Sequence, residues 1–169
     1  TPTAPCRHPP LPPSGAAPCC GDRAKFIHPS AALFDRVVMA AEAAGFEYCL
    51  VPVAATCWEA WISSAMAVAK TTRIKALVAA RPGYVSPVQL AKMGATFDQL
   101  SGGRLAVNLI AGQSEIETEA EGIRLAKEDR YALMDEDVSI MKALWTARGK
   151  VDFDGRFHTL KGASISPQP

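Results

Sequence analysis

The chain has 169 residues, 49% of them hydrophobic, which suits one globular domain with a sizeable core. Eighteen Lys and Arg residues against 17 Asp and Glu residues give a net charge of +1, and no basic run of the kind that follows nucleic-acid phosphates occurs. No stretch is apolar enough to span a membrane and no signal-peptide pattern opens the chain. We therefore expect a cytoplasmic protein with neither nucleic acid nor membrane as a partner.

The cysteines give no sign of a disulfide framework or a metal site. They are odd in number, contain no CxxC pair and do not alternate with histidines at the spacing of zinc ligands. The five are Cys6, Cys19, Cys20, Cys49 and Cys57.

The N-terminal segment 1–29 differs in composition from the rest. Its first 20 residues contain seven prolines and no apolar run, a composition that favours extended polyproline conformations. We expect residues 1–29 to be disordered. The PLPP within it is also compatible with an SH3 or WW ligand, although such short matches are common by chance.

A regular alternation of helix and strand signals begins at Ser30, a good N-cap residue. Apolar residues at helical spacing predict a helix that ends at Gly45, a residue suited to a left-handed cap. The apolar run 46–53 then predicts a strand buried on both faces. A second helix follows, with one side lined by Trp58, Trp61, Ile62, Ala65 and Ala69.

The same alternation repeats twice more. The segment 73–80 reads as a strand, and Ser86 followed by Pro87 reads as the start of a helix that ends at Gly102. The third strand is 104–111. The strand starts are separated by about 30 residues, the length of a βαβ unit.

The C-terminal third contains a long helix and a hairpin. After an acidic stretch, apolar residues at steps of three and four predict an amphipathic helix over 128–147. Alternating apolar residues around Asp154 and Gly155 then predict a hairpin over 151–160.

Three strand–helix units with apolar strands indicate an α/β fold with a parallel sheet, either doubly wound or part of a (β/α)8 barrel. No GxGxxG or GxxxxGK[ST] motif is present. In either architecture the functional groups lie on the loops that follow the strands, here 53–57, 81–84 and 108–114.

Several segments, in this order, resemble the bacterial luciferase-like flavin-dependent monooxygenases, and within them the alkanesulfonate monooxygenase group. They cover about residues 30–169, and together they are more specific than any one of them alone. The segments are AAEAAGFEYCLVP, TCWEAW, ARPGYVSPVQLAKMGATFDQLSGGRLAVNLIAG, the DRY that opens the long helix, and VDFDGRFHTLKGA.

The resemblance implies that residues 30–169 form the N-terminal half of a (β/α)8 TIM barrel. It also implies a monooxygenase that uses reduced FMN (FMNH2) and O2 to oxygenate a small organic substrate. That substrate would be an alkanesulfonate or a related compound of sulfur metabolism, cleaved at its C–S bond to an aldehyde and sulfite. An NAD(P)H-dependent flavin reductase would supply the FMNH2, and the intact enzyme would be a homo-oligomer.

The resemblance further implies the residues of the site. Asn108 matches an asparagine whose side chain faces the edge of the isoalloxazine ring, and Cys57 matches a cysteine beside the reactive face of the flavin. Cys57 is thus the catalytic candidate. The implied cofactor-binding residues are Val53, Ala54, Asn108, Glu117, Arg130 and Tyr131.

Each of these residues also has an ordinary structural interpretation. Asn108 could hydrogen-bond a neighbouring loop, because an unpaired buried amide costs about 1 to 3 kcal/mol, and Cys57 could be a small buried residue. Arg130 and Tyr131 begin a helix, where anions are favoured, but they could equally be a surface residue and a core residue. The acidic run that contains Glu117 is typical of a solvated face.

The sequence departs from the family pattern in two places. The first strand of the barrel should precede residue 30, and the second half of the barrel is absent, so we expect a truncated chain. Two alternatives follow: an inactive remnant that associates through unpaired strand edges, or an oxidoreductase of the same superfamily that uses the deazaflavin F420. The context of Cys57 favours FMN.

Overall fold

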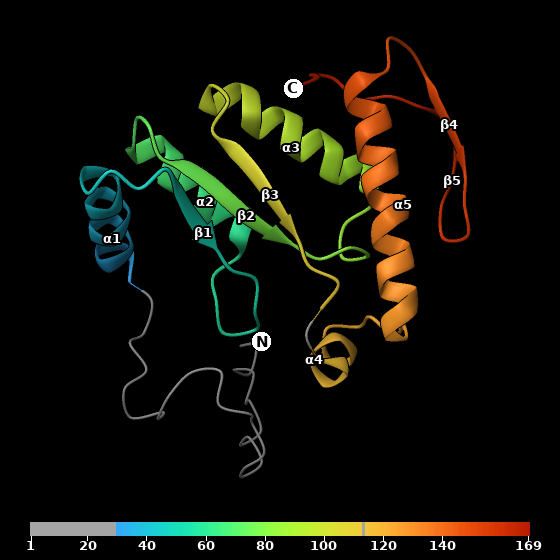
Figure 1. Cartoon of the computed structure of the whole chain (residues 1–169), viewed down its shortest axis with the longest axis horizontal. Coiled ribbons are helices and arrows are strands. Elements are labelled where there is room, and N and C mark those ends of the chain that lie inside the picture. The colour runs from blue at the N-terminus through green and yellow to red at the C-terminus, as the bar shows by residue number, and fades with distance from the viewer. Residues whose placement is uncertain (1–29, 113) are drawn as a thin grey trace, which may run out of the picture.

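The computed structural model describes residues 30–112 and 114–169 (Figure 1). The predicted disorder of residues 1–29 therefore lies outside the described residues. The elements are α1 (Ala31–Ala43), β1 (Tyr48–Val51), α2 (Ala60–Lys70), β2 (Lys75–Ala80), α3 (Pro87–Ser101), β3 (Leu105–Leu109), α4 (Glu115–Ala120), α5 (Lys127–Thr146), β4 (Val151–Asp154) and β5 (Thr159–Ala163).

The centre of the fold is a parallel sheet of three strands in the order β1-β2-β3. Leu50 pairs with Leu77, which in turn pairs with Ala106, and Ala79 pairs with Asn108. The predicted parallel sheet, its three strand–helix units and the C-terminal hairpin β4-β5 are confirmed. The strands are shorter than predicted, by two to four residues in total at their ends.

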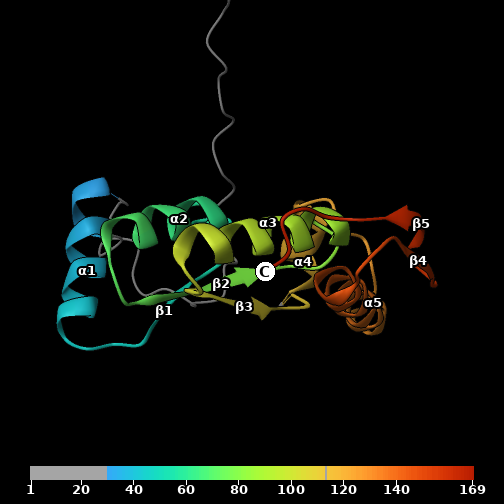
Figure 2. The same cartoon turned by 90° about the horizontal axis from the view of Figure 1, so that it is seen from above.

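The helices α2 and α3 cover one side of this sheet, while α1 and α5 lie beyond its two edge strands (Figure 2). The core between sheet and helices contains alternate strand residues, among them Ala76 and Val78 of β2, together with Phe97 of α3. A second group joins α3 to α5 through Leu90, Ile140 and Leu144. Burial of each such large apolar side chain contributes roughly 1.5 to 3 kcal/mol.

The prediction that β1 is buried on both faces is wrong for the described residues. Leu50 is 55% exposed and Tyr48 is also exposed, whereas Val51 is buried. Alternate side chains of a strand point to opposite faces, and within 30–112 and 114–169 no helix covers the face that carries Leu50 (Figure 2). This face is called the open face below; its central residues are Leu50, Leu77, Ala79, Ala106 and Asn108.

The apolar side of α2 that the sequence outlined is only partly buried. Trp61 packs against the core, but Ile62 is 69% exposed, and the buried side consists mainly of small residues, among them Ser64 and Ala67, together with Val68. Small side chains allow the helix backbone to pack closely against β2. Trp58 precedes the helix and lies against Phe34 of α1, with 6.0 Å between the ring centroids.

The helix ends follow the capping rules on which the sequence prediction rests. Ser30 accepts a hydrogen bond from the Leu33 amide, and Ser86 accepts one from the Gln89 amide ahead of Pro87. Gly45 and Gly102 both have positive φ angles, 83° and 67°, which a residue with a Cβ atom rarely adopts.

Two polar clusters fasten the amino-terminal edge of the sheet. The carboxylate of Glu42 accepts hydrogen bonds from the backbone amides of Thr72, Arg73 and Ile74. These amide donors, Ile74 first, lower the pKa of Glu42 from 4.5 to about 2. Arg104 donates to the carbonyl oxygens of Val68, Thr71 and Ser101 and thereby joins β3 to the end of α2.

The hairpin is held against α5 by another pair of carboxylates. Glu136 accepts hydrogen bonds from the amides of residues 156–158, and its oxygen leaves no space for a Cβ atom at Gly155. The fully buried Asp137 lies 2.7 Å from Nε2 of His158. Burial raises the pKa of Asp137, although the neighbouring imidazole opposes this effect.

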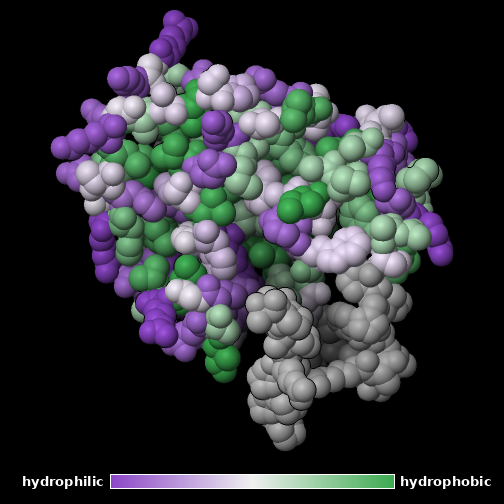
Figure 3. Space-filling model, turned by 180° about the vertical axis from the view of Figure 1, so that it is seen from behind, coloured by the Kyte–Doolittle hydropathy of each residue, from purple (hydrophilic) through white to green (hydrophobic). Residues whose placement is uncertain are grey.

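On the helix-covered side of the molecule, hydrophobic and hydrophilic side chains are intermixed at the surface (Figure 3). No helix in residues 30–112 and 114–169 is long and apolar enough to cross a membrane.

Candidate functional site

The loops that follow β1, β2 and β3 gather at the carboxyl edge of the sheet, where α4 lies (Figure 1). The predicted loops 53–57 and 81–84 are joined there by the side chain of Arg81. The segment 114–121, which was expected to be a solvated acidic stretch, instead forms α4 and turns two carboxylates toward that side chain.

Arg81 directly follows β2, and its side chain is only 5% exposed. Its Nη2 atom lies 2.8 Å from Glu117 and 3.3 Å from the carbonyl oxygen of Val53. Its Nη1 atom pairs with Glu121 and lies 3.4 Å from the Tyr84 hydroxyl, which itself donates to Glu121. Among the described residues, its Nε has no hydrogen-bond partner.

These contacts fix the protonation states in the cluster formed by Arg81, Tyr84, Glu117 and Glu121, called the Arg81 cluster below. Burial disfavours the charged guanidinium, but hydrogen bonds and attraction to Glu117 outweigh this and raise the pKa of Arg81. Burial, together with the hydrogen bond to Glu121, raises the pKa of Tyr84. At neutral pH the cluster therefore contains a permanent cation and a protonated phenol.

Asn108 occupies the last but one position of β3 and faces the open side of the sheet beside Ala79. It is half-buried, and none of the side-chain hydrogen bonds within 30–112 and 114–169 involves its amide. Its neighbour Ala79 on β2 is buried, and Ala106 on the same face of β3 is half-buried. Among the described residues, Asn108 therefore does not hydrogen-bond a neighbouring loop, which was the structural alternative for this residue.

Arg130 and Tyr131 lie differently from each other. Arg130 is buried, and its Nε and Nη1 donate to the carbonyl oxygens of Ala111 and Leu125, each at 2.8 Å. These two bonds fix the loop around Gly112, whose φ of 96° lets the chain turn at the end of β3. Tyr131 is exposed, so its alternative interpretation as a core residue does not apply.

The remaining predicted site residues follow β1. Val53 contributes its carbonyl to Arg81, and the carbonyl of Ala54 accepts the amide of Cys57 at 3.0 Å within a turn. Cys57 is exposed with a free thiol, so the interpretation of a small buried residue does not apply. The structure thus brings Val53 and Glu117 together at Arg81, and leaves Tyr131 on a helix surface.

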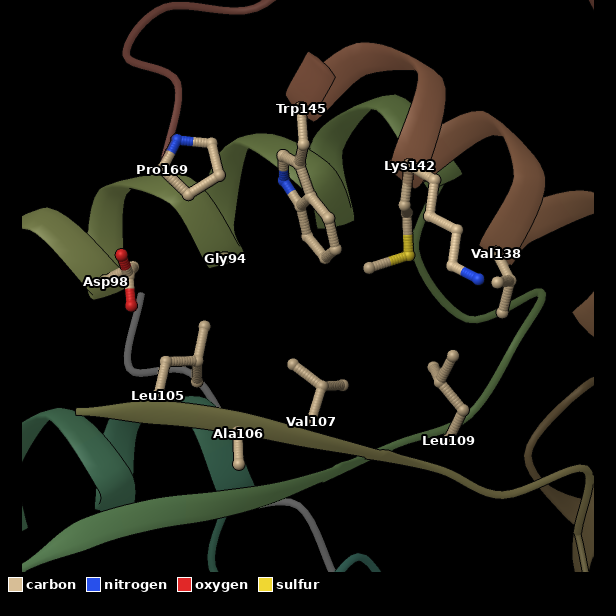
Figure 4. Close-up of a pocket in the computed structure, with 11 residues that line it drawn as sticks. Gly94, Asp98, Leu105, Ala106, Val107, Leu109, Val138, Lys142, Trp145 and Pro169 are labelled. Carbon is tan, nitrogen blue, oxygen red and sulfur yellow. The ribbon is translucent and has the colours of Figure 1, made fainter. Parts of the chain in front are cut away.

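A pocket of about 390 Å³ lies on the opposite side of β3 from Asn108 (Figure 4). Leu105, Val107 and Leu109 point into it, while Ala106 points away toward the open face. Trp145 of α5 closes one wall and donates from its indole nitrogen to the carbonyl of Ala91. This pocket is a gap between α3, α5 and β3, and it lies apart from the carboxyl-edge loops.

The family comparison agrees with this geometry. The family described as luciferase-like monooxygenase matches residues 14–169, most of the chain. The chain therefore belongs to the luciferase-like monooxygenase family.

Solved structures share its fold. The EDTA monooxygenase from Chelativorans sp. BNC1 is 16% identical with a TM-score of 0.71, over 80% of this chain and 40% of that one. The oxygenating constituent of 3,6-diketocamphane monooxygenase from Pseudomonas putida, solved with FMN, is 21% identical with a TM-score of 0.66, over 82% and 44%. The coenzyme F420 dependent tetrahydromethanopterin reductase from Methanopyrus kandleri is 17% identical with a TM-score of 0.70, over 83% and 44%.

The chain thus spans between 40% and 44% of the length of these three structures. At such identities the likeness establishes the α/β fold with parallel strands alternating with helices. Enzymes that act on different substrates share it.

Sequence reasoning included Arg81 and Tyr84 only as the ends of the candidate loop 81–84, and Glu121 only as part of the acidic run, and gave none of the three a role. The one sequence signal for Arg81 was its position directly after an apolar strand, because charged residues at the carboxyl ends of parallel strands are candidates for a functional role. Glu121 carried no such signal because its partner lies 40 residues away. The contact of His158, in the predicted hairpin, with the buried Asp137 also has no sequence signal, because the two residues lie 21 positions apart.

Proposed function

We propose that the chain is part of an FMNH2-dependent monooxygenase that uses O2 to oxygenate a small organic substrate. The substrate we favour is an alkanesulfonate or a related sulfur compound, cleaved at its C–S bond. Family membership supports the oxygenase class, and the segment TCWEAW with Cys57 supports the alkanesulfonate choice. An NAD(P)H-dependent flavin reductase would supply the FMNH2, and the whole enzyme would be a cytoplasmic homo-oligomer.

The observation that carries this proposal is the arrangement around Asn108. Flat aromatic cofactors are bound by mostly apolar surfaces with a few well-placed polar groups. On the open face, the half-buried Leu77 and Ala106 provide the apolar surface. The free amide of Asn108 provides both a donor and an acceptor, so the residues present fit one edge of an isoalloxazine ring.

When bound, reduced flavin supplies the activation of O2. In this proposal Asn108 orients the ring by hydrogen bonding, and Val53 and Ala54 contact its edge from the loop after β1. Cys57, exposed in the same loop, shapes the space beside the ring. Arg130 acts indirectly, because its bonds to Ala111 and Leu125 fix the loop next to Asn108.

The test is a fluorescence titration of the purified chain with FMN, repeated anaerobically with FMNH2 and with F420. We expect saturable binding of FMN and FMNH2, and Asn108→Ala to weaken it about tenfold, since one hydrogen-bonding side chain is lost. Asn108→Asp is the informative companion, because it keeps the shape and removes the donor.

A matched control is Gln99→Ala, which removes an exposed amide on α3 far from the open face. Equal affinity for FMN in the wild type and in Asn108→Ala would contradict the role of Asn108. Binding of F420 but not FMN would replace the cofactor in the proposal.

A further inference from the structure

In the Arg81 cluster, the negative charges outnumber the positive charge. One guanidinium faces two carboxylates, Glu117 and Glu121, so the cluster has a net charge of −1. A buried cation requires one anionic partner. One carboxylate is enough to neutralise Arg81, so the second is not required for charge balance. Glu117 and Glu121 also repel each other, because they are like charges four positions apart.

Of the two carboxylates, Glu121 is the one more easily displaced. Glu117 lies in the first turn of α4, where a negative charge is favoured, whereas Glu121 is the C-cap residue, where it is not. The side chains of Glu117 and Glu121 are 28% and 24% exposed against 5% for Arg81, so either carboxylate can turn to water while the guanidinium cannot, and it is the position on α4 that makes Glu121 the easier one to displace. The fully buried Thr118 keeps α4 in place without Glu121.

The atoms that Glu121 would release are two donors that point to the same place. They are Nη1 of Arg81 and the hydroxyl of Tyr84, 3.4 Å apart. Tyr84 is 37% exposed, so the position opens to solvent at the carboxyl edge of the sheet. The raised pKa of Tyr84 keeps its hydroxyl a donor.

We propose that Arg81 and Tyr84 form a binding site for a monoanionic oxyanion of a small organic ligand, a carboxylate or a sulfonate, and that Glu121 occupies this site until the ligand arrives. The inference rests on the proposed function only in taking this ligand to be the enzyme's substrate. The exchange costs little because one oxyanion replaces another at a cation that never loses its charge.

The experiment is a ligand-detected NMR titration of the chain at low ionic strength, without flavin. The probes are butane-1-sulfonate and butanoate, with neutral butanamide as the reference. We expect saturable binding of at least one anion and none of the amide. Glu121→Gln removes the competing charge and should tighten binding about fivefold, whereas Tyr84→Phe removes a donor to a charged group and should weaken it about tenfold.

Glu119→Gln is the matched control, because Glu119 is an exposed carboxylate of the same helix that does not contact Arg81. It should leave the affinity unchanged. Circular dichroism of each variant checks that it is folded. Tyr84→Phe is expected to fold, because Tyr84 is partly exposed and the change removes only its hydroxyl.

No saturable binding to either the wild type or Glu121→Gln would overturn the proposal, as would equal effects of Glu121→Gln and Glu119→Gln. The relative affinities of sulfonate and carboxylate identify the preferred oxyanion. Since flavin is absent from this titration, a failure to bind FMN would contradict the proposed function and leave this inference standing.

Discussion

Two arginines at opposite edges of the sheet illustrate how the partners of a charged side chain decide its role. Arg104 donates to three carbonyl oxygens and to the Thr71 hydroxyl, at the amino-terminal edge. Arg81 faces carboxylates at the carboxyl edge. Carbonyl partners are neutral and belong to the backbone, so Arg104 stabilises the fold, whereas the side-chain anions at Arg81 can be exchanged.

We expect Arg104→Lys to lower the free energy of unfolding by about 2 kcal/mol, because lysine keeps the charge but its single nitrogen cannot reach the three carbonyls that Nε, Nη1 and Nη2 of the guanidinium serve. Urea denaturation followed by circular dichroism measures this. Arg73→Lys is the control: its guanidinium makes one exposed bond to Glu42, and the change should cost about 0.5 kcal/mol or less. Equal losses would show that the contacts of Arg104 contribute nothing special.

Single residues were predictable where the backbone itself imposed the choice. Gly45 and Gly102 were identified as helix caps because positive φ angles favour glycine, and Ser86 with Pro87 was identified as a helix start. The contact of Arg81 with Glu121 could not be predicted, since it depends on how two loops 40 residues apart fold back on each other.

At the scale of elements, α1 depends on one carboxylate. Its final turn contains Glu42, whose carboxylate accepts hydrogen bonds from the backbone amides of the loop between α2 and β2. Those amides would otherwise have to find partners in water. Glu42 therefore fixes where α1 lies relative to the sheet.

The contribution of Glu42 should depend on pH. Its pKa is lowered from 4.5 to about 2, so its stabilisation is fully present above pH 4.5 and is lost as the pH falls from 4.5 toward 2. We expect Glu42→Gln to be less stable than the wild type at pH 7 and to lose less stability on acidification over that range. Thermal melts at several pH values measure the difference.

Glu47→Gln is the control, because Glu47 pairs only with the side chain of Lys75 at the surface. A constant difference in stability between wild type and Glu42→Gln from pH 7 to pH 2.5 would contradict the assignment.

The elements themselves were largely predictable, since the three parallel strands, the four longer helices α1, α2, α3 and α5 and the hairpin follow from apolar periodicity and capping residues. The buried face of α2 was not, because its contact surface consists mainly of Ser and Ala with Val68, and the apolar pattern included Ile62, which is exposed. The short α4 was missed because its stability comes from Arg81 and from the buried Thr118, not from a local apolar pattern.

For the whole molecule, the main feature is the open face of the sheet. Its exposed members Leu50 and Tyr48 lie on an edge strand. Apolar sheet faces and free strand edges favour association with other chains. The same surface is the one proposed to contact the flavin ring.

We expect the isolated chain to self-associate through this face, and Leu50→Lys to increase the monomer fraction and decrease the binding of a hydrophobic dye. Size-exclusion chromatography over a concentration series and dye fluorescence measure both. Leu100→Lys is the control, because Leu100 is even more accessible, 85% exposed against 55% for Leu50, but lies at the end of α3. If both variants had the same effect, general solubility and not the open face would be responsible.

The two hydrogen bonds of Arg130 have a consequence for motion. They bind the carbonyls of Ala111 and Leu125 to one side chain, and so hold together both ends of the segment that contains α4. A loop whose ends are already joined can rearrange at little further entropic cost. If Glu121 leaves Arg81 as proposed, these bonds would still join the end of β3 to the start of α5, so the carboxyl edge could change while the sheet and α5 keep their places.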